Sequence, residues 1–169
     1  MPITVAIVED NDQLRGTLAR VINRAEGFKC VSQYANAEAA LAGLPKDNPE
    51  VVLMDINLPG LNGVECVRQL KQLAPQIQAV MLTVYEDTDN IFNALAAGAT
   101  GYLLKRTKSA ELLESIREVH RGGSPMTTHI ARKVTQSLQK AGPSQQPTEN
   151  LSQREQEVLD LLSQGFLYK

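Results

Sequence analysis

The sequence predicts an α/β protein in which a doubly wound, five-stranded parallel sheet is followed by a C-terminal helical extension. Over residues 1–122, five short runs rich in apolar and β-branched residues alternate with amphipathic helical patterns. Strand–helix–strand units of this kind connect through right-handed crossovers, which make the strands parallel and put helices on both faces of the sheet. The runs at 51–54 and 79–82 are apolar throughout, as is typical of strands buried on both faces.

The elements can be placed by the spacing of apolar residues. The predicted strands cover residues 3–8, 28–34, 51–55, 78–83 and 101–105. One helical face at i, i+4, i+7 and i+8 predicts the first helix, with Asp12 as its N-cap and a stripe of Leu14, Leu18, Val21 and Ile22. Similar stripes predict the third and fifth helices, formed by Val64, Val67 and Leu70 and by Leu112, Leu113, Ile116 and Val119. Weaker patterns predict helices at about 36–44 and 88–97.

The sequence changes character after the fifth predicted helix, which a Gly-Gly-Ser-Pro run at 122–125 should end. A sixth helix is predicted by apolar residues spaced four apart, namely Met126, Ile130, Val134 and Leu138. Residues 141–150 are rich in Pro, Ser and Gln and predict a flexible linker. Ser152 and Glu155 then form a capping-box pair at the start of another apolar helical pattern. The chain thus divides into a domain at 1–122, a helix and linker at 123–150, and a short segment at 151–169.

Composition excludes several classes of protein. The 17 basic and 19 acidic side chains give a net charge of −2, which is unlike a strongly basic nucleic-acid-binding module. Cys30 and Cys66 lack a CxxC pair or a neighbouring histidine cluster, which indicates reduced thiols. No stretch approaches the roughly 20 apolar residues of a membrane span, so we expect a soluble, cytoplasmic protein. His120 and His129 lie on predicted helices, far in sequence from the acidic residues, and we expect both on the surface.

Chemically active side chains follow the predicted strands. In a doubly wound sheet, ligands bind beyond the carboxyl ends of the strands, near the point where the strand order reverses. The residues at those ends are Glu9, Asp10, Asp55, Thr83 and Lys105. Three carboxylates in one crevice repel each other, and a small, hard divalent cation such as Mg²⁺ relieves that repulsion. A carboxylate surrounded by Mg²⁺, an ammonium and a hydroxyl is suited to phosphoryl transfer.

Four segments of the sequence resemble the receiver domain of two-component response regulators. They are AIVEDN, VVLMDINLPGLNGVE, AVMLTVYED and AAGATGYLLK, and the resemblance extends over about residues 1–122. It implies a flavodoxin-like receiver fold and a signalling function that is not that of a multiple-turnover enzyme. Asp55 would be the phosphoacceptor for a histidine kinase. Mg²⁺ would bind the side chains of Asp10 and Asp55 and the backbone carbonyl of Asn57, and Glu9 would reach the ion directly or through a water.

The resemblance also implies a switch. Thr83 would move toward the phosphoryl group, Lys105 would pair with a phosphoryl oxygen, and the ring of Tyr102 would move inward as Thr83 moves. Many receivers have a proline in a cis peptide after the lysine, whereas this chain has Arg106, so the local geometry after Lys105 stays open.

The segment LSQREQEVLDLLSQG is similar to the start of the LuxR-type helix-turn-helix domain of the NarL/FixJ subfamily. This similarity covers only about residues 150–167, and we expect a truncated output domain without a recognition helix. Full-length relatives would bind DNA, and this chain would not. A phosphorylation-dependent homodimer is the expected assembly, with a histidine kinase as the partner and no membrane association.

Two other functions fit parts of the pattern. A Mg²⁺-dependent phosphatase or phosphotransferase also works through an aspartyl phosphate, but normally has a second Asp two residues later as general acid, where this chain has Asn57. A flavodoxin-like FMN binder needs a Ser/Thr/Gly loop after the first strand. Here that loop reads Glu-Asp-Asn-Asp, which would repel a phosphate.

Overall fold

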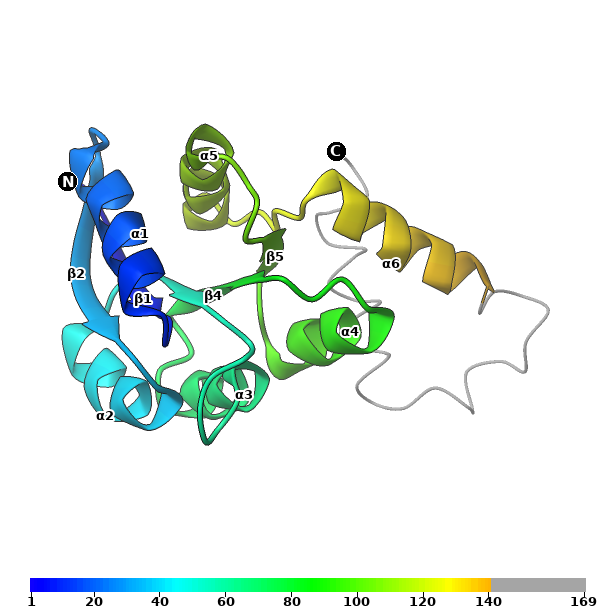
Figure 1. Ribbon diagram of the computed structural model, residues 1–169, viewed down its shortest axis with the longest axis horizontal. Helices are drawn as coiled ribbons and strands as arrows, with labels where there is room; N and C mark the ends of the chain where they lie inside the picture. The colour runs from blue at the N-terminus through cyan, green and yellow to red at the C-terminus, as the bar shows by residue number, and fades with distance from the viewer. Residues whose placement is uncertain (141–169) are drawn as a thin grey trace.

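The computed structural model describes residues 1–140, and in this part of the chain five strands alternate with five helices before a sixth helix follows (Figure 1). The elements are β1 (Ile3–Val8), α1 (Asp12–Arg24), β2 (Phe28–Tyr34), α2 (Ala37–Asp47), β3 (Val51–Met54), α3 (Gly63–Leu73), β4 (Gln78–Thr83), α4 (Thr88–Ala97), β5 (Gly101–Leu104), α5 (Ser109–His120) and α6 (Thr128–Lys140). The linker predicted at 141–150 and the segment at 151–169 lie outside the described residues.

The strands form one parallel sheet in the order β2-β1-β3-β4-β5. The chain moves outward from β1 to β2 and then returns to the other side of β1, so the order reverses between β1 and β3. Parallel strands present their carboxyl ends at one edge, and this reversal opens a crevice there. The predicted doubly wound fold is confirmed.

Side chains that alternate along each strand build two separate layers of core. Val5 and Ile7 point to the layer that α1 and α5 complete, whereas Ala6 and Val8 point to the layer completed by α2, α3 and α4. Figure 1 shows α1 and α5 on one side of the sheet and α2, α3 and α4 on the other. α6 joins the second layer through Ile130. The fully buried strands explain the apolar runs that the sequence shows at β3 and β4.

Side-chain caps begin the first four helices. The capping side chains, each accepting from the backbone N–H three residues later, are Asn11, Asn36, Asn62 and Asp87. The prediction that Asp12 caps α1 is wrong. Asn11 has the extended backbone of a cap and its Oδ1 accepts from the Leu14 N–H at 3.0 Å, while Asp12 is the first helical residue and pairs with Arg15 at 2.5 Å.

Other boundaries differ from the prediction by a few residues. β3 and β5 each end one residue early, so Asp55 and Lys105 are the first residues after their strands. α2 continues three residues beyond the predicted end and stops at Asn48, whose left-handed backbone (φ 48°) is a conformation that asparagine tolerates. Met126, predicted as part of the sixth helix, precedes α6 and pairs with Tyr102 in a parallel bridge.

The start of α3 presses against the loop that carries Asp55. A Cβ atom built on Gly63 would lie 1.9 Å from the backbone oxygen of Asp55 and 2.9 Å from Cα of Ile56. The Gly63 N–H donates to the Ile56 carbonyl at 2.8 Å. Only glycine permits this approach, so the first residue of α3 packs directly against the backbone of Asp55.

We predict that Gly63→Ala lowers the free energy of unfolding by about 1–3 kcal/mol because the added methyl group displaces backbone atoms. Gly16 in α1 provides the matched control, since the nearest atom to an added Cβ is Nη1 of Arg20 at 3.8 Å. There, Gly16→Ala should raise stability by up to about 1 kcal/mol, the usual gain of alanine over glycine in a helix. Urea denaturation measures both values. If the two substitutions changed the free energy of unfolding in the same direction, the close contact at Gly63 would be contradicted.

Candidate functional site

Acidic side chains from two neighbouring strands meet in the crevice at the carboxyl edge of the sheet. Glu9 and Asp10 follow β1, and Asp55 follows β3. One carboxylate oxygen from each residue lies within 4.8 Å of the other two. Glu9 and Asp55 are buried, with relative exposures of 2% and 4%, while Asp10 is exposed at the mouth. The structure therefore brings together the three carboxylates that the strand ends predict.

Lys105 places one ammonium group against two of these carboxylates. Its Nζ lies 2.8 Å from Oε1 of Glu9 and 3.0 Å from Oδ2 of Asp55. Burial lowers the pKa of the Lys105 ammonium, but the hydrogen bonds to Glu9 and Asp55 outweigh this effect and raise it above the usual value. Lys105 is therefore a fixed positive charge at neutral pH.

The positive charge does not fully compensate Glu9. Burial raises the pKa of its carboxyl above the usual range, even though hydrogen bonds from Lys105 and from the Asn11 backbone lower it, and the Asp55 charge raises it further. Desolvation and like-charge repulsion both disfavour an ionised acid. The cluster therefore retains unfavourable negative charge that a cation would stabilise.

Residues of the β1–α1 loop and of α1 hold Glu9 in place. The Asn11 N–H donates to Oε2 of Glu9 at 3.1 Å, and Nη1 of Arg15 donates to the Glu9 backbone carbonyl at 2.7 Å. Sequence reasoning missed both residues. Asn11 carries a signal, because an asparagine directly before a helical pattern is a common cap. Arg15 carries none, since an arginine on the first turns of a helix is usually a surface residue.

Asp55 is held by its own loop. Its backbone N–H donates to the Val8 carbonyl at 3.1 Å, which continues the pairing of β1 with β3. Its Oδ1 accepts a long hydrogen bond of 3.4 Å from the Asn57 N–H, and its Oδ2 faces Lys105. Asn57 is exposed, two residues beyond Asp55, where the phosphatase alternative requires a proton-transferring acid.

Thr83 and Tyr102 are connected through the loop that follows β4. Thr83 is fully buried, its Oγ1 accepts from the Tyr85 N–H at 3.3 Å, and its carbonyl accepts from the Lys105 N–H at 2.8 Å. The Tyr102 ring is also fully buried, and its hydroxyl donates to the Tyr85 carbonyl at 2.8 Å. Burial raises the pKa of the Tyr102 hydroxyl, so the side chain stays neutral. Tyr85 thus joins the two predicted switch residues.

The remaining candidates lie outside the crevice. His120 and His129 are about half exposed and contact Glu50 and Glu86, at 2.6 and 2.9 Å. Both cysteines are free: Cys66 is buried, which raises the pKa of its thiol to about 12, whereas Cys30 is only partly buried. The peptide after Lys105 is trans, because residues 1–140 contain no cis peptide. No helix in the same range is long and apolar enough to cross a membrane.

This arrangement suits a hard cation and a tetrahedral anion. Carboxylate oxygens are preferred ligands of Mg²⁺, which usually keeps several waters and takes one or two carboxylates. The acids of the β1–α1 loop face the position where a flavodoxin-like protein would hold the phosphate of FMN, so they disfavour that ligand. Asp55 lies beside both the acids and the Lys105 ammonium.

Comparisons with known proteins identify relatives over nearly the whole chain. The family described as "Response regulator receiver domain" matches residues 5–117. Transcriptional regulatory protein DegU of Brevibacillus brevis is 32% identical over 97% of this chain and 76% of its own. The DNA-binding transcriptional activator DevR/DosR of Mycobacterium tuberculosis is 29% identical over 99% and 77% of the two chains.

Solved structures agree with the sequence comparisons. The crystal structure of a LuxR-family two-component response regulator from Aurantimonas sp. SI85-9A1 superposes with a TM-score of 0.77 at 28% identity, covering 81% of this chain and 98% of that one. The response regulator ChrA of a heme-sensing two-component system gives 0.67 at 26% identity over 96% and 76%. The protein therefore belongs to the response regulators of two-component systems, and residues 5–117 are its receiver domain.

Proposed function

We propose that this response regulator is a switch that accepts a phosphoryl group on Asp55 from a histidine kinase. One observation carries the proposal: the Lys105 ammonium contacts both Glu9 and Asp55, in a crevice where three carboxylates lie within 4.8 Å. Phosphoryl transfer needs positioning and charge neutralisation more than covalent chemistry from the protein. A buried aspartate beside a fixed cation supplies both.

The proposed step is a displacement at phosphorus. A carboxylate oxygen of Asp55 forms a bond to the phosphorus of the donor phosphohistidine while the P–N bond breaks. The bonding electrons leave with the donor imidazole, and Asp55 becomes an acyl phosphate. Lys105 lies 3.0 Å from Oδ2 of Asp55, so it is positioned to pair with an oxygen of the arriving group.

Mg²⁺ fits the donor set of the crevice. We assign its ligands to the side chains of Glu9, Asp10 and Asp55 and to the backbone carbonyl of Asn57. The raised pKa of the Glu9 carboxyl supports this assignment, because burial first and the Asp55 charge after it disfavour the ionised acid, and a cation would offset both effects. When bound, the ion would neutralise charge on the phosphoryl oxygens. Asp10 stays exposed, so a hydrated ion can reach it.

The response to phosphorylation would pass from Thr83 to Tyr102. In the structure the Thr83 hydroxyl contacts its own loop, and movement toward Asp55 would bring it to a phosphoryl oxygen. Tyr85 would move with it, because its N–H contacts Thr83 and its carbonyl accepts from Tyr102. Asn57 lacks a transferable proton at the position of a phosphatase acid, which favours a switch over a multiple-turnover enzyme.

The proposed role in transcription rests on the similarity to the relatives. DevR/DosR is described as a DNA-binding transcriptional activator, and we extend a role in transcriptional control to this protein. Self-association of the phosphorylated form is part of the same proposal. The similarity to a LuxR-type helix-turn-helix falls on residues 150–167, outside the described part of the chain.

The first prediction concerns the acceptor. Incubation with acetyl phosphate and Mg²⁺ should add one phosphoryl group to the protein, and Asp55→Asn should abolish the adduct because an amide is a poor nucleophile. Asp89→Asn, which changes an exposed acid on α4, serves as the control and should keep the adduct. Intact-protein mass spectrometry gives the stoichiometry. An Asp55→Asn protein that still gains one group at the normal rate would disprove the assignment, and steady turnover without an adduct would favour the phosphatase.

The second prediction concerns the metal. Mg²⁺ should raise the melting temperature of the wild-type protein, because a ligand that binds only the folded state stabilises it. Asp10→Ala should remove most of this rise and slow labelling by acetyl phosphate at least about tenfold, the usual cost of losing one good ligand. Calorimetry with increasing Mg²⁺ measures the first effect. Normal labelling in excess chelator would refute the metal site.

The third prediction concerns pH. Lys105→Met should destabilise the protein by about 3 kcal/mol at neutral pH, because it leaves buried carboxylates without a counter-ion. Burial already raises the pKa of Glu9, and loss of the ammonium raises it further. A carboxyl group whose pKa is raised in the folded state destabilises that state once it ionises. The loss of stability in Lys105→Met relative to wild type should therefore appear as the pH rises above about 4 and fade below it.

The matched control for this prediction is Lys29→Met, which changes an exposed lysine on β2. Its stability relative to wild type should show no such pH dependence. Urea unfolding at several pH values compares the two. A Lys105→Met deficit of the same size at pH 3 and pH 7 would show that lost packing, and not lost charge, is responsible.

A further inference from the structure

The chain between α5 and α6 extends the sheet beyond β5. β5 is an edge strand, and its Tyr102 N–H donates to the Pro125 carbonyl at 3.0 Å while the Thr127 N–H donates back to the Tyr102 carbonyl at 3.3 Å. The Leu104 N–H donates to Oγ1 of Thr127 at 3.2 Å. The approach requires Gly101, since a Cβ there would lie 2.8 Å from the Pro125 oxygen. The start of α6 is therefore attached to the strand that carries Tyr102.

α6 also buries apolar side chains against this region. Ile130 and Val134 are fully buried and belong to the same core cluster as Ile91 and Leu95 of α4 and Tyr102 of β5. Figure 1 shows α6 beside α4, beyond the β5 edge of the sheet. The helix thus covers the side of the domain on which the Tyr102 ring packs.

Two basic residues of α6, His129 and Lys133, lie near the loop that follows β4. Nε2 of His129 lies 2.9 Å from Oε1 of Glu86 in that loop. The next residue, Asp87, has a lowered pKa because the Asn90 side chain donates to it and, to a smaller extent, because of the positive charge of Lys133. Two neighbouring acids of the loop therefore face two basic groups of the helix.

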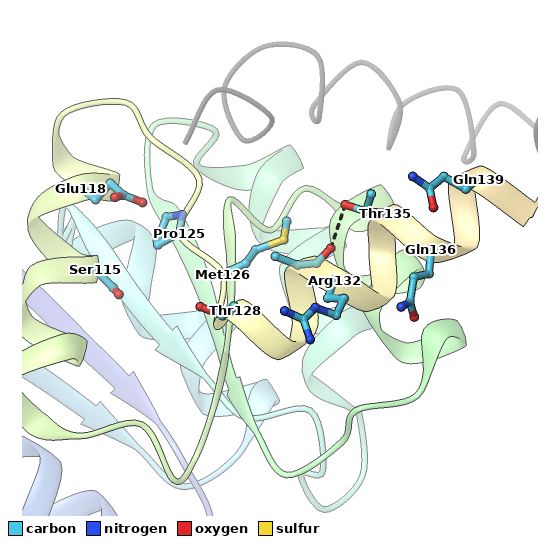
Figure 2. Close-up of a pocket in the computed structure, with 10 residues that line it drawn as sticks. Ser115, Glu118, Pro125, Met126, Thr128, Arg132, Thr135, Gln136 and Gln139 are labelled. Carbon is cyan, nitrogen blue, oxygen red and sulfur yellow. Dashed lines mark hydrogen bonds between the residues drawn. The ribbon is translucent and has the colours of Figure 1, made fainter.

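The opposite side of α6 faces a groove. Figure 2 shows Arg132, Gln136 and Gln139 on the side of the helix that borders this space, with Ser115 and Glu118 of α5 across from it. The groove has a volume of about 820 Å³. The apolar and ionic contacts described above fasten α6 along its α4 and β5 side.

These contacts lead to the loop that moves in the proposed switch. Glu86 follows Tyr85, whose backbone joins Thr83 to Tyr102. We propose that α6 is a latch: its contact through His129 with Glu86 holds the β4–α4 loop in the unphosphorylated position, and movement of Thr83 toward a phosphoryl group loosens the helix. The proposal rests on phosphorylation of Asp55. By reciprocity, a looser latch favours the phosphorylated arrangement to the same degree.

Hydrogen exchange of the α6 amides tests the latch without any phosphoryl donor. Glu86→Gln and His129→Gln each remove the contact, so α6 should exchange about two- to fivefold faster, the range expected for one exposed ion pair. His129→Gln separates the α6 contact from the pair that Glu86 forms with Arg106 at 3.4 Å. Glu50→Gln is the matched control: it removes the His120–Glu50 pair, which lies away from α6, and should leave α6 exchange unchanged.

The same measurement with acetyl phosphate and Mg²⁺ tests the coupling, with intact mass recorded on each sample. An adduct accompanied by faster exchange in α6 supports the latch, and the increase should be smaller in His129→Gln, where the latch is already open. An adduct with unchanged α6 exchange overturns the latch while the proposed function stands. A missing adduct overturns the proposed function and the coupling with it. Unchanged α6 exchange in both latch variants also overturns the proposal.

Discussion

Lys105 extends from the end of β5 past β4 and shares its ammonium between carboxylates that follow β1 and β3. At about 4 Å and an effective dielectric near 20, two like charges cost about 4 kcal/mol, and an opposite charge at that distance returns a similar amount. One ammonium therefore cannot offset three carboxylates. The pKa of Glu9 is raised mainly by burial, and the charge of Asp55 raises it further. The charges in the crevice are only partly balanced, and a bound cation would complete the balance.

The backbone keeps this costly cluster in place. The Asp55 N–H is bonded to the Val8 carbonyl and the Lys105 N–H to the Thr83 carbonyl, so the first residue after each of two strands is still part of the sheet. Arg15 holds the Glu9 carbonyl in the same way. The side chains of Glu9, Asp55 and Lys105 therefore project from backbone that hydrogen bonds hold in place. Backbone placement of this kind keeps the buried carboxylates close together in spite of their repulsion.

Much of this arrangement could be predicted from the sequence because period-2 and period-3.6 patterns place strands and helices, and parallel strands must end at one edge. Asp55 and Lys105 were found in this way, without knowledge of their contacts. The patterns do not contain tertiary contacts. They did not decide between Asn11 and Asp12 as the cap of α1, since both residues are good caps. They also predicted α6 as a helix but could not show that Ile130 would pack on the domain core.

The position of Tyr102 gives the two faces of the sheet different roles. Its ring belongs to the core layer of α2, α3, α4 and α6, whereas Leu103 belongs to the layer of α1 and α5. Interiors this close-packed respond to a displaced ring by repacking its immediate neighbours. A movement of Tyr102 must therefore act first on α4 and on α6, because the segment that leads into α6 is hydrogen-bonded to Tyr102 through Pro125 and Thr127. A movement of Tyr102 can reach the face covered by α1 and α5 only through the sheet. Of the two faces, this one is therefore better suited to a surface that stays constant while the protein switches.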